Sequence, residues 1–368
     1  MADLLVHLTT PGEWRSALSA GAVRPPSLTG AGFVHLSTPE LVHLPAARLF
    51  AGRRDVVLLA VDPARLTAPV RWEPGVPGDP AGLRFPHLYG PLPVTAVVGV
   101  VPWRPDRPVE LPAAGDAAAR HRALATSLPV RRAGTVVDLP GGFAVADADW
   151  AASRDDNRAV WTALPTAEEV GSVTGELAGR LGWSVPAATL LHAAAGPVAD
   201  ALERQGWDVS PTVVMAREAP FPPSAGRAQV VPQADVHELW ERSWRRELAP
   251  LPEPQLTRIS GQLVGRERRT DAVVRVLDVA VREQGRVVAA GQLRIDGATA
   301  AVESVVTAPA ARRRGHGDAV LARALALAAE AGCDLVVLEA AALDWPRAWY
   351  ARRGFTVVGR SWDVHHPG

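Results

Sequence analysis

Residues 305–318 place a strand-like apolar run, an arginine-rich glycine loop and the start of a helix in immediate succession. Three arginines at 312–314 are followed by Gly315 and Gly317. The N–H groups in the first turn of a helix lack an internal partner and lie at the positive end of the helix dipole. Glycine lets the backbone approach an anion closely. The pattern predicts an anion site best suited to a pyrophosphate; an ordinary arginine-rich helix start is the alternative.

The segment from 226 to 368 is predicted to be a mixed unit of helices and strands that carries this loop. Apolar residues at helical spacing and β-rich runs follow one another in a clear order. Turns are expected near Gly285 and Gly297, and a helix stop at Gly332. The predicted helices cover 234–247, 255–264, 317–331 and 345–353, and the predicted strands cover 274–281, 287–295, 300–307 and 334–339, with a last strand from 355.

Two motifs, together with this order of elements, resemble the GNAT superfamily of N-acetyltransferases over the whole of 226–368. The glycine loop is similar to the acetyl-coenzyme-A loop of that family. An aromatic motif further along the chain is similar to the family's tyrosine-containing ending. The two motifs are Arg312-x-x-Gly315-x-Gly317 and Tyr350-x-x-x-Gly354-Phe355.

The resemblance implies an acetyl-CoA-dependent N-acetyltransferase that transfers an acetyl group to an amine of a small molecule or peptide. The backbone of the strand before the loop would pair with the pantetheine arm as an added strand would. The loop N–H groups would hold the pyrophosphate, and the side chain of His316 is expected to contact only phosphate or solvent. The residues implied to bind acetyl-CoA are Val305, Val306, Thr307, Arg312, Arg313, Arg314, Gly315, His316, Gly317 and Asp318.

Two catalytic side chains are implied by the same resemblance. Tyr350 would lie near the sulfur and protonate the departing thiolate as general acid; a core tyrosine is the alternative. Glu303 matches a position where some relatives carry a catalytic glutamate, and a base must take a proton from the attacking amine. Glu339, at the end of the next strand, is the second carboxylate considered, and a solvated strand-edge carboxylate is the alternative for Glu303. Strand alternation puts Glu303, Val305 and Thr307 on one face.

The segment 113–225 is predicted to be a degenerate GNAT-like lobe paired with the active one; a helical linker domain is the alternative. The motif Leu202-x-x-x-Gly206-Trp207 resembles the tyrosine-containing ending with leucine in place of tyrosine. No Arg-x-x-Gly-x-Gly loop occurs in this segment. The polar run 153–157 either lines an acceptor cleft or forms an exposed turn. The elements expected here are helices over 167–181 and 194–205 and a strand over 212–215.

Three histidines of the first segment lie beside short strand-like runs, in loops that carry glycine or proline. With their neighbours they resemble a small bacterial family of unassigned function over about residues 1–105. The resemblance implies an ADP-ribosyltransferase-like α+β fold. Its members often carry a cysteine where this chain has Leu36, so any role of that thiol is absent here. The candidate site residues are His7, His35, Ser37, Glu73, His87 and Tyr89.

Three uses of these N-terminal residues stay open. In an NAD-dependent ADP-ribosyl transfer, His7, His35, Ser37 and Tyr89 would hold the ribose and the nicotinamide while Glu73 steadies an oxocarbenium-like centre. The three imidazoles are also potential zinc ligands, but their wide separation gives no ligand spacing, and we expect no metal. In the third interpretation they are hydrogen-bonded structural histidines in a binding domain, and the protein is a non-enzymatic nucleotide-binding regulator.

The length of 368 residues exceeds what one core supports, since single cores stop growing near ~250–300 residues. Proline-rich stretches at 101–112 and 219–226 cannot continue a helix or a central strand. They divide the chain into 1–112, 113–225 and 226–368. The predicted fold class is α+β and α/β multidomain: a small ADP-ribosyltransferase-like domain, then a GNAT-like mixed sheet flanked by helices.

Composition excludes several classes of protein. Lys+Arg 39 and Asp+Glu 39 give a net charge of zero, which argues against nucleic acid or an anionic membrane as partner. No apolar run approaches the ~20 residues of a membrane span, and the start of the chain lacks a secretory signal. Cys333 is the single cysteine, which excludes an internal disulfide, and the absence of lysine excludes Schiff-base chemistry and Walker-type loops. We therefore expect a soluble, cytoplasmic protein.

Overall fold

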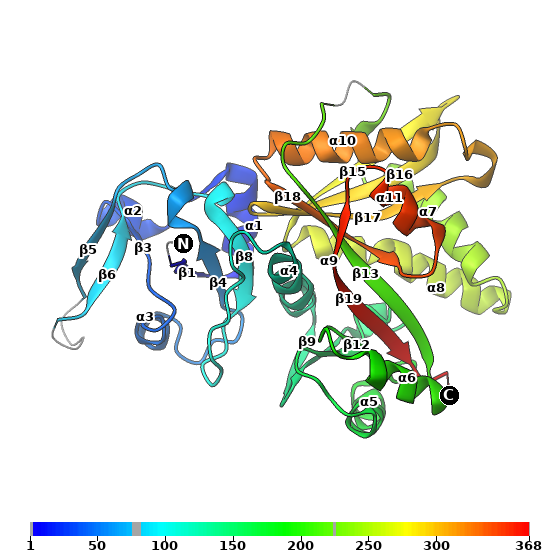
Figure 1. The fold of residues 1–368 in the computed structure, drawn as a ribbon, viewed down its shortest axis with the longest axis horizontal. Helices are drawn as coiled ribbons and strands as arrows, with labels where there is room; N and C mark the ends of the chain where they lie inside the picture. The colour runs from blue at the N-terminus through cyan, green and yellow to red at the C-terminus, as the bar shows by residue number, and fades with distance from the viewer. Residues whose placement is uncertain (1–2, 76–81, 224–225, 368) are drawn as a thin grey trace.

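The computed structural model of the chain describes residues 3–75, 82–223 and 226–367. It contains an N-terminal unit with small antiparallel sheets and one large mixed sheet flanked by helices (Figure 1). The predicted boundary between the second and third segments falls at residues 224–225, which lie outside the described residues. Within the described ranges, no helix has the length and hydropathy that a membrane crossing requires.

The N-terminal unit packs three small sheets, β1-β4-β8, β3-β6-β5 and β2-β7, around a shared apolar core. Helix α1 starts with a capping box between Thr10 and Glu13, and it buries Trp14 completely. The ADP-ribosyltransferase-like fold of this unit stays a prediction. The elements are β1 (Leu5–Thr9), α1 (Pro11–Ala20), β2 (Ala22–Val23), α2 (Pro26–Gly30), β3 (Val34–His35), α3 (His43–Leu49), β4 (Val57–Val61), β5 (Val70–Pro74), β6 (Arg84–Leu88), β7 (Leu92–Pro93) and β8 (Val97–Pro102).

The large sheet has 11 strands in the order β14-β15-β16-β17-β18-β13-β19-β12-β11-β10-β9. Its strands are β9 (Thr135–Leu139), β10 (Gly142–Ala146), β11 (Arg158–Trp161), β12 (Ala187–Leu190), β13 (Asp208–Glu218), β14 (Gln229–Val231), β15 (Arg275–Glu283), β16 (Arg286–Asp296), β17 (Thr299–Thr307), β18 (Leu335–Ala341) and β19 (Thr356–His365). The helices around it are α4 (Ala117–Arg132), α5 (Ala167–Leu181), α6 (Gly196–Arg204), α7 (Ala234–Glu247), α8 (Glu253–Gly265), α9 (Glu267–Asp271), α10 (His316–Glu330) and α11 (Trp345–Ala351).

Two halves of this sheet repeat one arrangement and exchange their last strands. Each half has a parallel pair, β11 with β12 and β17 with β18. Strand β19 of the C-terminal half lies against β12, and strand β13 of the middle segment lies against β18. The two exchanged strands pair with each other at the centre of the sheet. The middle and C-terminal segments therefore complete each other's sheet.

The apolar pattern of the strands and helices explains the layering. Helix α10 covers one face of β15–β18 with Val320, Leu321 and Leu325, and α7 covers the opposite face of β15 and β16 with Val236 and Leu239. The predicted helices and strands of 226–368 are confirmed to within a few residues at their ends, whereas β14 and α9 were not predicted. The helices and strand expected in 113–225 are confirmed as α5, α6 and part of β13.

Buried polar contacts fix the N-terminal unit against the large sheet. The indole Nε1 of Trp14 donates to Asp296 Oδ1 at 2.7 Å, and the guanidinium of Arg131 pairs with the same carboxylate. The N–H of Ala298 donates to the carbonyl of Val97 at 2.8 Å. Because these groups belong to three segments of the chain, they hold the unit in one position relative to the sheet.

Candidate active site

Strands β17 and β18 run parallel and pair only at their start. The paired residues are Thr299–Ala301 of β17 and Leu335–Val337 of β18. Beyond them, β18 stays paired with β13 as far as Ala341, and β17 stays paired with β16 as far as Thr307. Within the described ranges, the edge of β17 over 302–307 that faces β18 thus has no strand partner. Its N–H and C=O groups are available to an extended ligand.

A β-bulge interrupts β17 at Ser304. This residue has a φ of 52°, and the register between β17 and β16 shifts opposite Gly291. A Cβ atom on Gly291 would lie 3.0 Å from Val320 and 3.1 Å from Val305, so only glycine fits there without movement of its neighbours. The bulge inserts one extra residue into the strand and turns the following side chains over.

The bulge places Glu303 on the face of the sheet that α7 and α9 cover. Val305 packs in the core beneath α10, whereas Val306 packs against the cluster of α7. The Glu303 carboxylate lies 3.7 Å from the guanidinium of Arg294, on the α9 side. The prediction that Glu303 shares a face with Val305 and Thr307 is therefore wrong, because strand alternation does not continue through a bulge.

The loop between β17 and α10 contains two residues with left-handed backbone, Arg313 with a φ of 61° and Gly315 with a φ of 74°. The first helical hydrogen bond runs from Ala319 to Gly315 at 3.1 Å. The six N–H groups of residues 313–318 donate to no acceptor in the part of the chain that the structure describes. Successive N–H groups in such a conformation form an anion-binding concavity, here at the positive end of α10.

The three arginines of this loop place positively charged guanidinium groups around the concavity. Arg314 pairs with Glu283 at 2.8 Å, and Nε of Arg312 donates to the carbonyl of Thr307 at 3.3 Å. The side chain of Arg313 is exposed and has no hydrogen bond or ion pair with any described residue. The guanidinium group of Arg313 is thus available to bind an anion.

His316 is the first residue of α10, and its ring is buried with 1% exposure. Its Nε2 lies 3.0 Å from the Glu283 carboxylate, beneath the loop. The prediction that this side chain contacts phosphate or solvent is wrong, because the first turn of the helix directs it into the protein. Only the backbone N–H of His316 remains for an anion.

Tyr350 lies on α11 with 8% exposure, and its ring packs against Trp349 and Phe355 at centroid distances of 4.7 and 5.7 Å. Its hydroxyl makes no hydrogen bond within the described ranges. Burial raises the pKa of this phenol well above its usual value, and the charge of Glu303 adds to the rise. The phenol therefore stays protonated at neutral pH, as a general acid must, and it lies near Glu303.

The two candidate bases differ in their surroundings. Burial raises the pKa of Glu303; Arg294 opposes this rise and Glu339 adds to it. Burial would also raise the pKa of Glu339, but the interactions with His121, whose Nε2 lies 3.0 Å from the carboxylate, and with Arg158 together outweigh it, and the pKa is lowered. Glu303 is consequently the better proton acceptor of the two, and its side chain is 36% exposed and so open to a substrate.

Asp278 and Gln292 continue a polar row from Glu303 across β15, β16 and β17. Gln292 donates to the Asp278 carboxylate at 2.9 Å, and both side chains are buried. Burial raises the pKa of Asp278 from its model-peptide value of 3.8 to about 6, although the hydrogen bond from Gln292 opposes the rise. The folded protein therefore binds this proton more tightly than the unfolded chain does.

We expect Asp278→Asn to stabilise the protein more at pH 8 than at pH 4.5. The stability that the protonated Asp278 provides is present at low pH and is lost as pH rises through about 6. A shift of this size corresponds to roughly 3 kcal/mol, whereas asparagine keeps the acceptor for Gln292 and does not titrate. Urea unfolding of wild type and variant at both pH values measures the difference. A difference that does not change with pH would contradict the burial of an ionisable carboxyl here.

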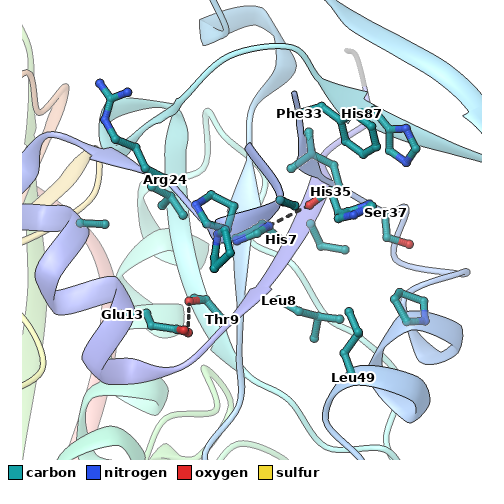
Figure 2. A pocket seen from close by; sticks show the side chains of 18 of the residues that line it. His7, Leu8, Thr9, Glu13, Arg24, Phe33, His35, Ser37, Leu49 and His87 are labelled. Carbon is teal, nitrogen blue, oxygen red and sulfur yellow. Dashed lines mark hydrogen bonds between the residues drawn. The ribbon is translucent and has the colours of Figure 1, made fainter. Parts of the chain in front are cut away.

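The six candidate residues of the N-terminal unit lie together, and Figure 2 shows four of them around one pocket. Nδ1 of His7 lies 2.8 Å from the carbonyl oxygen of His35, and the rings of His35 and His87 are 5.1 Å apart. Nδ1 of His87 lies 2.7 Å from the carboxylate of Glu73, which also accepts the hydroxyl of Tyr89 at 2.8 Å. The remaining candidate, Ser37, lies beside His35 in the same pocket.

The pocket beside these residues has a volume of about 990 Å³. Its walls come from β1, α1, α2, α3, β3 and β6 of the N-terminal unit, so it is separate from the loop before α10. Among the described residues, no group of three or more His, Cys, Asp or Glu side chains is arranged to hold a metal ion.

Two family models match the chain. Residues 234–355 match the model described as the acetyltransferase (GNAT) family, over about a third of the chain. The C-terminal part of the chain is a GNAT domain. Residues 8–100 match the model of a protein of unknown function, DUF952. No curated protein matches the chain.

Three of the solved structures that are similar to the chain differ in how much of it they cover. A GCN5-related N-acetyltransferase from Kribbella flavida is 22% identical, with 70% of this chain and 97% of that chain covered and a TM-score of 0.46. A functionally unknown conserved protein from Staphylococcus epidermidis is 10% identical, with coverages of 63% and 94% and a TM-score of 0.49. A protein from Caulobacter crescentus is 33% identical, with coverages of 30% and 90% and a TM-score of 0.24.

The polar run 153–157 of the middle segment joins the GNAT domain beside Glu303. Ser153 is fully buried, and Asp156 pairs with Arg132 at 2.9 Å. Asp155 pairs at 2.7 Å with Arg266, which follows α8 of the GNAT domain. The run is a turn, as one alternative had it, but only Arg154 in it is exposed. The negative charge of Asp155 also contributes to the raised pKa of Glu303.

Sequence reasoning missed Arg294, which lies between Glu303 and Glu267. Its guanidinium is 2.8 Å from the Glu267 carboxylate and the residue is 8% exposed. A usable signal was present, because Gln292 and Arg294 alternate with Leu293 and Ile295 along a strand whose interior is otherwise apolar. Such polar positions in a two-sided buried strand indicate a functional or ion-paired face.

Proposed function

We propose that the protein is an acetyl-CoA-dependent N-acetyltransferase that acetylates an amine of a small molecule or peptide. The observation that carries the proposal is the run of six N–H groups over 313–318 that have no acceptor among the described residues, at the start of α10. Such a concavity suits a pyrophosphate. The unpaired edge of β17 beside it suits the amides of a pantetheine arm. Acetyl-CoA combines both features and supplies its acetyl group as a reactive thioester.

Two side chains at the gap between β17 and β18 suit the two proton transfers of the reaction: Glu303 as the base and Tyr350 as the acid. Glu303, whose pKa is raised by burial, takes the proton that the attacking amine loses, directly or through a water molecule. Tyr350, whose pKa is raised by burial, gives its hydroxyl proton to the departing sulfur and regains one from solvent. Holding the amine against the thioester in the right orientation supplies much of the remaining acceleration.

The middle segment is proposed to be a lobe that shapes the acceptor side without binding a second acetyl-CoA. Helix α5 corresponds to α10 in the repeated arrangement, but its first turn is closed by a capping box between Thr166 and Glu169. Helix α10 begins instead at Gly315, which has no side chain to cap it. The position equivalent to Tyr350 is Leu202, which is fully buried. One acetyl-CoA per chain is therefore expected.

Isothermal titration of the intact protein with acetyl-CoA tests the proposal. We expect saturable binding with a stoichiometry of one, and thiol release when a panel of primary amines is added. The absence of binding would refute the acetyltransferase. Two equivalent sites would refute the assignment of the middle segment.

Glu303→Gln should lower kcat by about 100-fold, the lower end of what a positioned general base contributes. Because the wild-type base works only when ionised, wild-type activity falls as pH drops through the raised pKa of Glu303, and the variant loses this acidic limb. Profiles of kcat against pH measure both effects. Glu339→Gln is the matched control. If it has the larger effect, the base is Glu339.

A further inference from the structure

The pocket of the N-terminal unit is separate from the residues assigned to acetyl transfer. Its described lining residues all fall between Val6 and His87, whereas the loop before α10 belongs to the C-terminal part of the chain. Its volume of about 990 Å³ lies at the upper end of the ~300–1,000 Å³ of small-molecule sites. A cavity of this size suits a drug-sized molecule rather than a single ion.

The wall of the pocket is largely apolar and carries three aromatic rings. Phe33, Phe50 and Phe85 line it, and these are half of the chain's six phenylalanines. Leucine, valine, alanine and proline residues supply much of the rest of the wall. Aromatic rings pack favourably against one another in offset or edge-to-face arrangements. This wall therefore suits a ligand with an aromatic body.

The hydrogen bonds of two lining histidines determine which ring nitrogen carries hydrogen. Nδ1 of His7 lies 2.8 Å from the carbonyl oxygen of His35, and Nδ1 of His87 lies 2.7 Å from the Glu73 carboxylate. Hydrogen bonds with His87 and Tyr89 lower the pKa of Glu73, so this carboxylate is ionised at neutral pH. A carbonyl and an ionised carboxylate only accept hydrogen bonds, so each Nδ1 carries hydrogen. In the neutral rings, each Nε2 then bears a lone pair.

These two Nε2 atoms are acceptors that the protein leaves unused. His7 and His87 both line the pocket and are 7% exposed, and neither Nε2 has a hydrogen-bond partner among the described residues. Burial lowers the pKa of His7, which keeps this ring neutral at neutral pH. The ring of His87 stacks on Phe33 at a centroid distance of 4.0 Å, which holds it in place. Buried acceptors without partners favour a ligand that donates hydrogen bonds.

The charged side chains of the pocket do not form a site for an ion. Glu13 already accepts hydrogen bonds from Thr10 at the start of α1. Arg24 is exposed to solvent, and Arg48 has an interaction of its own within the protein. Figure 2 shows Glu13 and Arg24 on the side of the pocket away from His87. We therefore expect the ligand to be uncharged.

We propose that this pocket binds an uncharged phenolic molecule of two or three rings that carries at least two hydroxyl groups. Two hydroxyls donate to Nε2 of His7 and Nε2 of His87, and the rings lie against the phenylalanines of the wall. A phenolic hydroxyl, with a pKa of about 10 as in tyrosine, is a good donor to an imidazole nitrogen and lies in the plane of its ring. An aromatic molecule without hydroxyls would leave both acceptors unpaired, and an aliphatic alcohol would make no ring contacts.

Calorimetric titration of the intact chain with a panel of dihydroxynaphthalene isomers tests the proposal. The isomers differ in the spacing of their two hydroxyls, and we expect at least one to bind with a stoichiometry of one. Its dimethyl ether keeps the rings but has no donor, and it should bind at least 10-fold more weakly. Octanediol keeps two hydroxyls but has no ring, and it should also bind at least 10-fold more weakly. A 10-fold loss corresponds to about 1.4 kcal/mol, the size of one hydrogen bond.

A pair of variants locates the binding in this pocket. His87→Phe removes the acceptor but keeps a ring that can stack on Phe33, and it should weaken binding of the isomer at least 10-fold. His192→Phe makes the same change in the middle segment and should bind the isomer as wild type does. Failure of every isomer to bind, equal affinity for the dimethyl ether or octanediol, or unchanged affinity in His87→Phe would each overturn the proposal.

A second arm separates this pocket from the acetyl-CoA site. Binding of the isomer should persist in Gly315→Val and in the presence of saturating acetyl-CoA. Loss of binding under either condition would place the isomer at the loop before α10 and overturn the proposal. None of these outcomes bears on whether acetyl-CoA binds, so the two proposals fail independently.

Long-range proton–nitrogen NMR spectra of the imidazoles test the histidine assignments in wild type, without any variant. We expect hydrogen on Nδ1 of His7 and His87, and a shift of both Nε2 signals when the isomer is added. Hydrogen found on Nε2 of both rings in the free protein would overturn the role of these nitrogens as acceptors. Nε2 signals that do not move on binding would overturn it as well.

Discussion

Replacing Gly315 with valine should weaken acetyl-CoA binding by about 100-fold or more. Gly315 has a φ of 74°, a conformation that a β-branched residue avoids. A valine would pull the loop out of this conformation, and the N–H groups over 313–318 would no longer converge on one point. Loss of two hydrogen bonds to a charged pyrophosphate, at ~1.5 kcal/mol each, corresponds to that factor. Isothermal titration of wild type and variant measures it.

Gly182→Val is the control for this substitution. Gly182 has a φ of 71° at the end of α5, and no atom lies within 4 Å of a Cβ placed there. Both variants should lose comparable stability from backbone strain, but only the change at Gly315 should affect binding. A folded Gly315→Val protein with wild-type affinity for acetyl-CoA would show that the loop does not hold the pyrophosphate.

Tyr350→Phe should lower kcat by about 10²–10⁴-fold while the affinity for acetyl-CoA changes little, as expected when a general acid is removed. Phenylalanine preserves the ring packing against Trp349 and Phe355. The hydroxyl of Tyr350 makes no hydrogen bond in the described chain, so its removal should not lower the free energy of unfolding. Pre-steady-state and steady-state assays of thiol release, together with titration, separate turnover from binding.

The chain offers a matched control, since it has only two tyrosines. Tyr89→Phe removes a hydroxyl that donates to Glu73 in the N-terminal unit, and it should leave acetyl transfer unchanged. Unchanged turnover in Tyr350→Phe would remove this residue from the mechanism, and thiolate departure would then rely on solvent.

The local elements of the C-terminal part could be predicted from the sequence because their signals are local. Apolar residues at helical spacing fix α7 and α10, and the turns at Gly285 and Gly297 separate the strands of the meander. The glycines of the loop before α10 also have a local meaning, since a left-handed backbone at Gly315 follows from its residue type.

The bulge at Ser304 could not be predicted, because it depends on how β17 pairs with Gly291 of β16 and on packing beneath α10. Without it, strand alternation puts Glu303 on the wrong face. The exchange of β13 and β19 could not be predicted either, because it depends on which strands pair with each other. A period-two pattern defines a strand but does not say which strand lies beside it.

The ion pairs between distant residues could not be predicted either, because they also depend on which elements lie side by side. Asp155 pairs with Arg266, more than a hundred residues along the chain, and Glu303 lies close to Arg294 on the neighbouring strand. In the N-terminal unit, the sequence identified the histidines as chemically notable. Only the fold brings His87 to Glu73 and leaves its second nitrogen facing a cavity.

Site-resolved amide hydrogen exchange, measured on the intact protein with and without acetyl-CoA, is the most direct test of the anion site. The N–H groups over 313–318 lack acceptors in the described structure, so they should exchange quickly in the free protein. We expect acetyl-CoA to protect most of them, along with N–H groups on the open edge of β17. Binding of acetyl-CoA that leaves 313–318 unprotected, or protects only residues elsewhere, would contradict the role assigned to this loop.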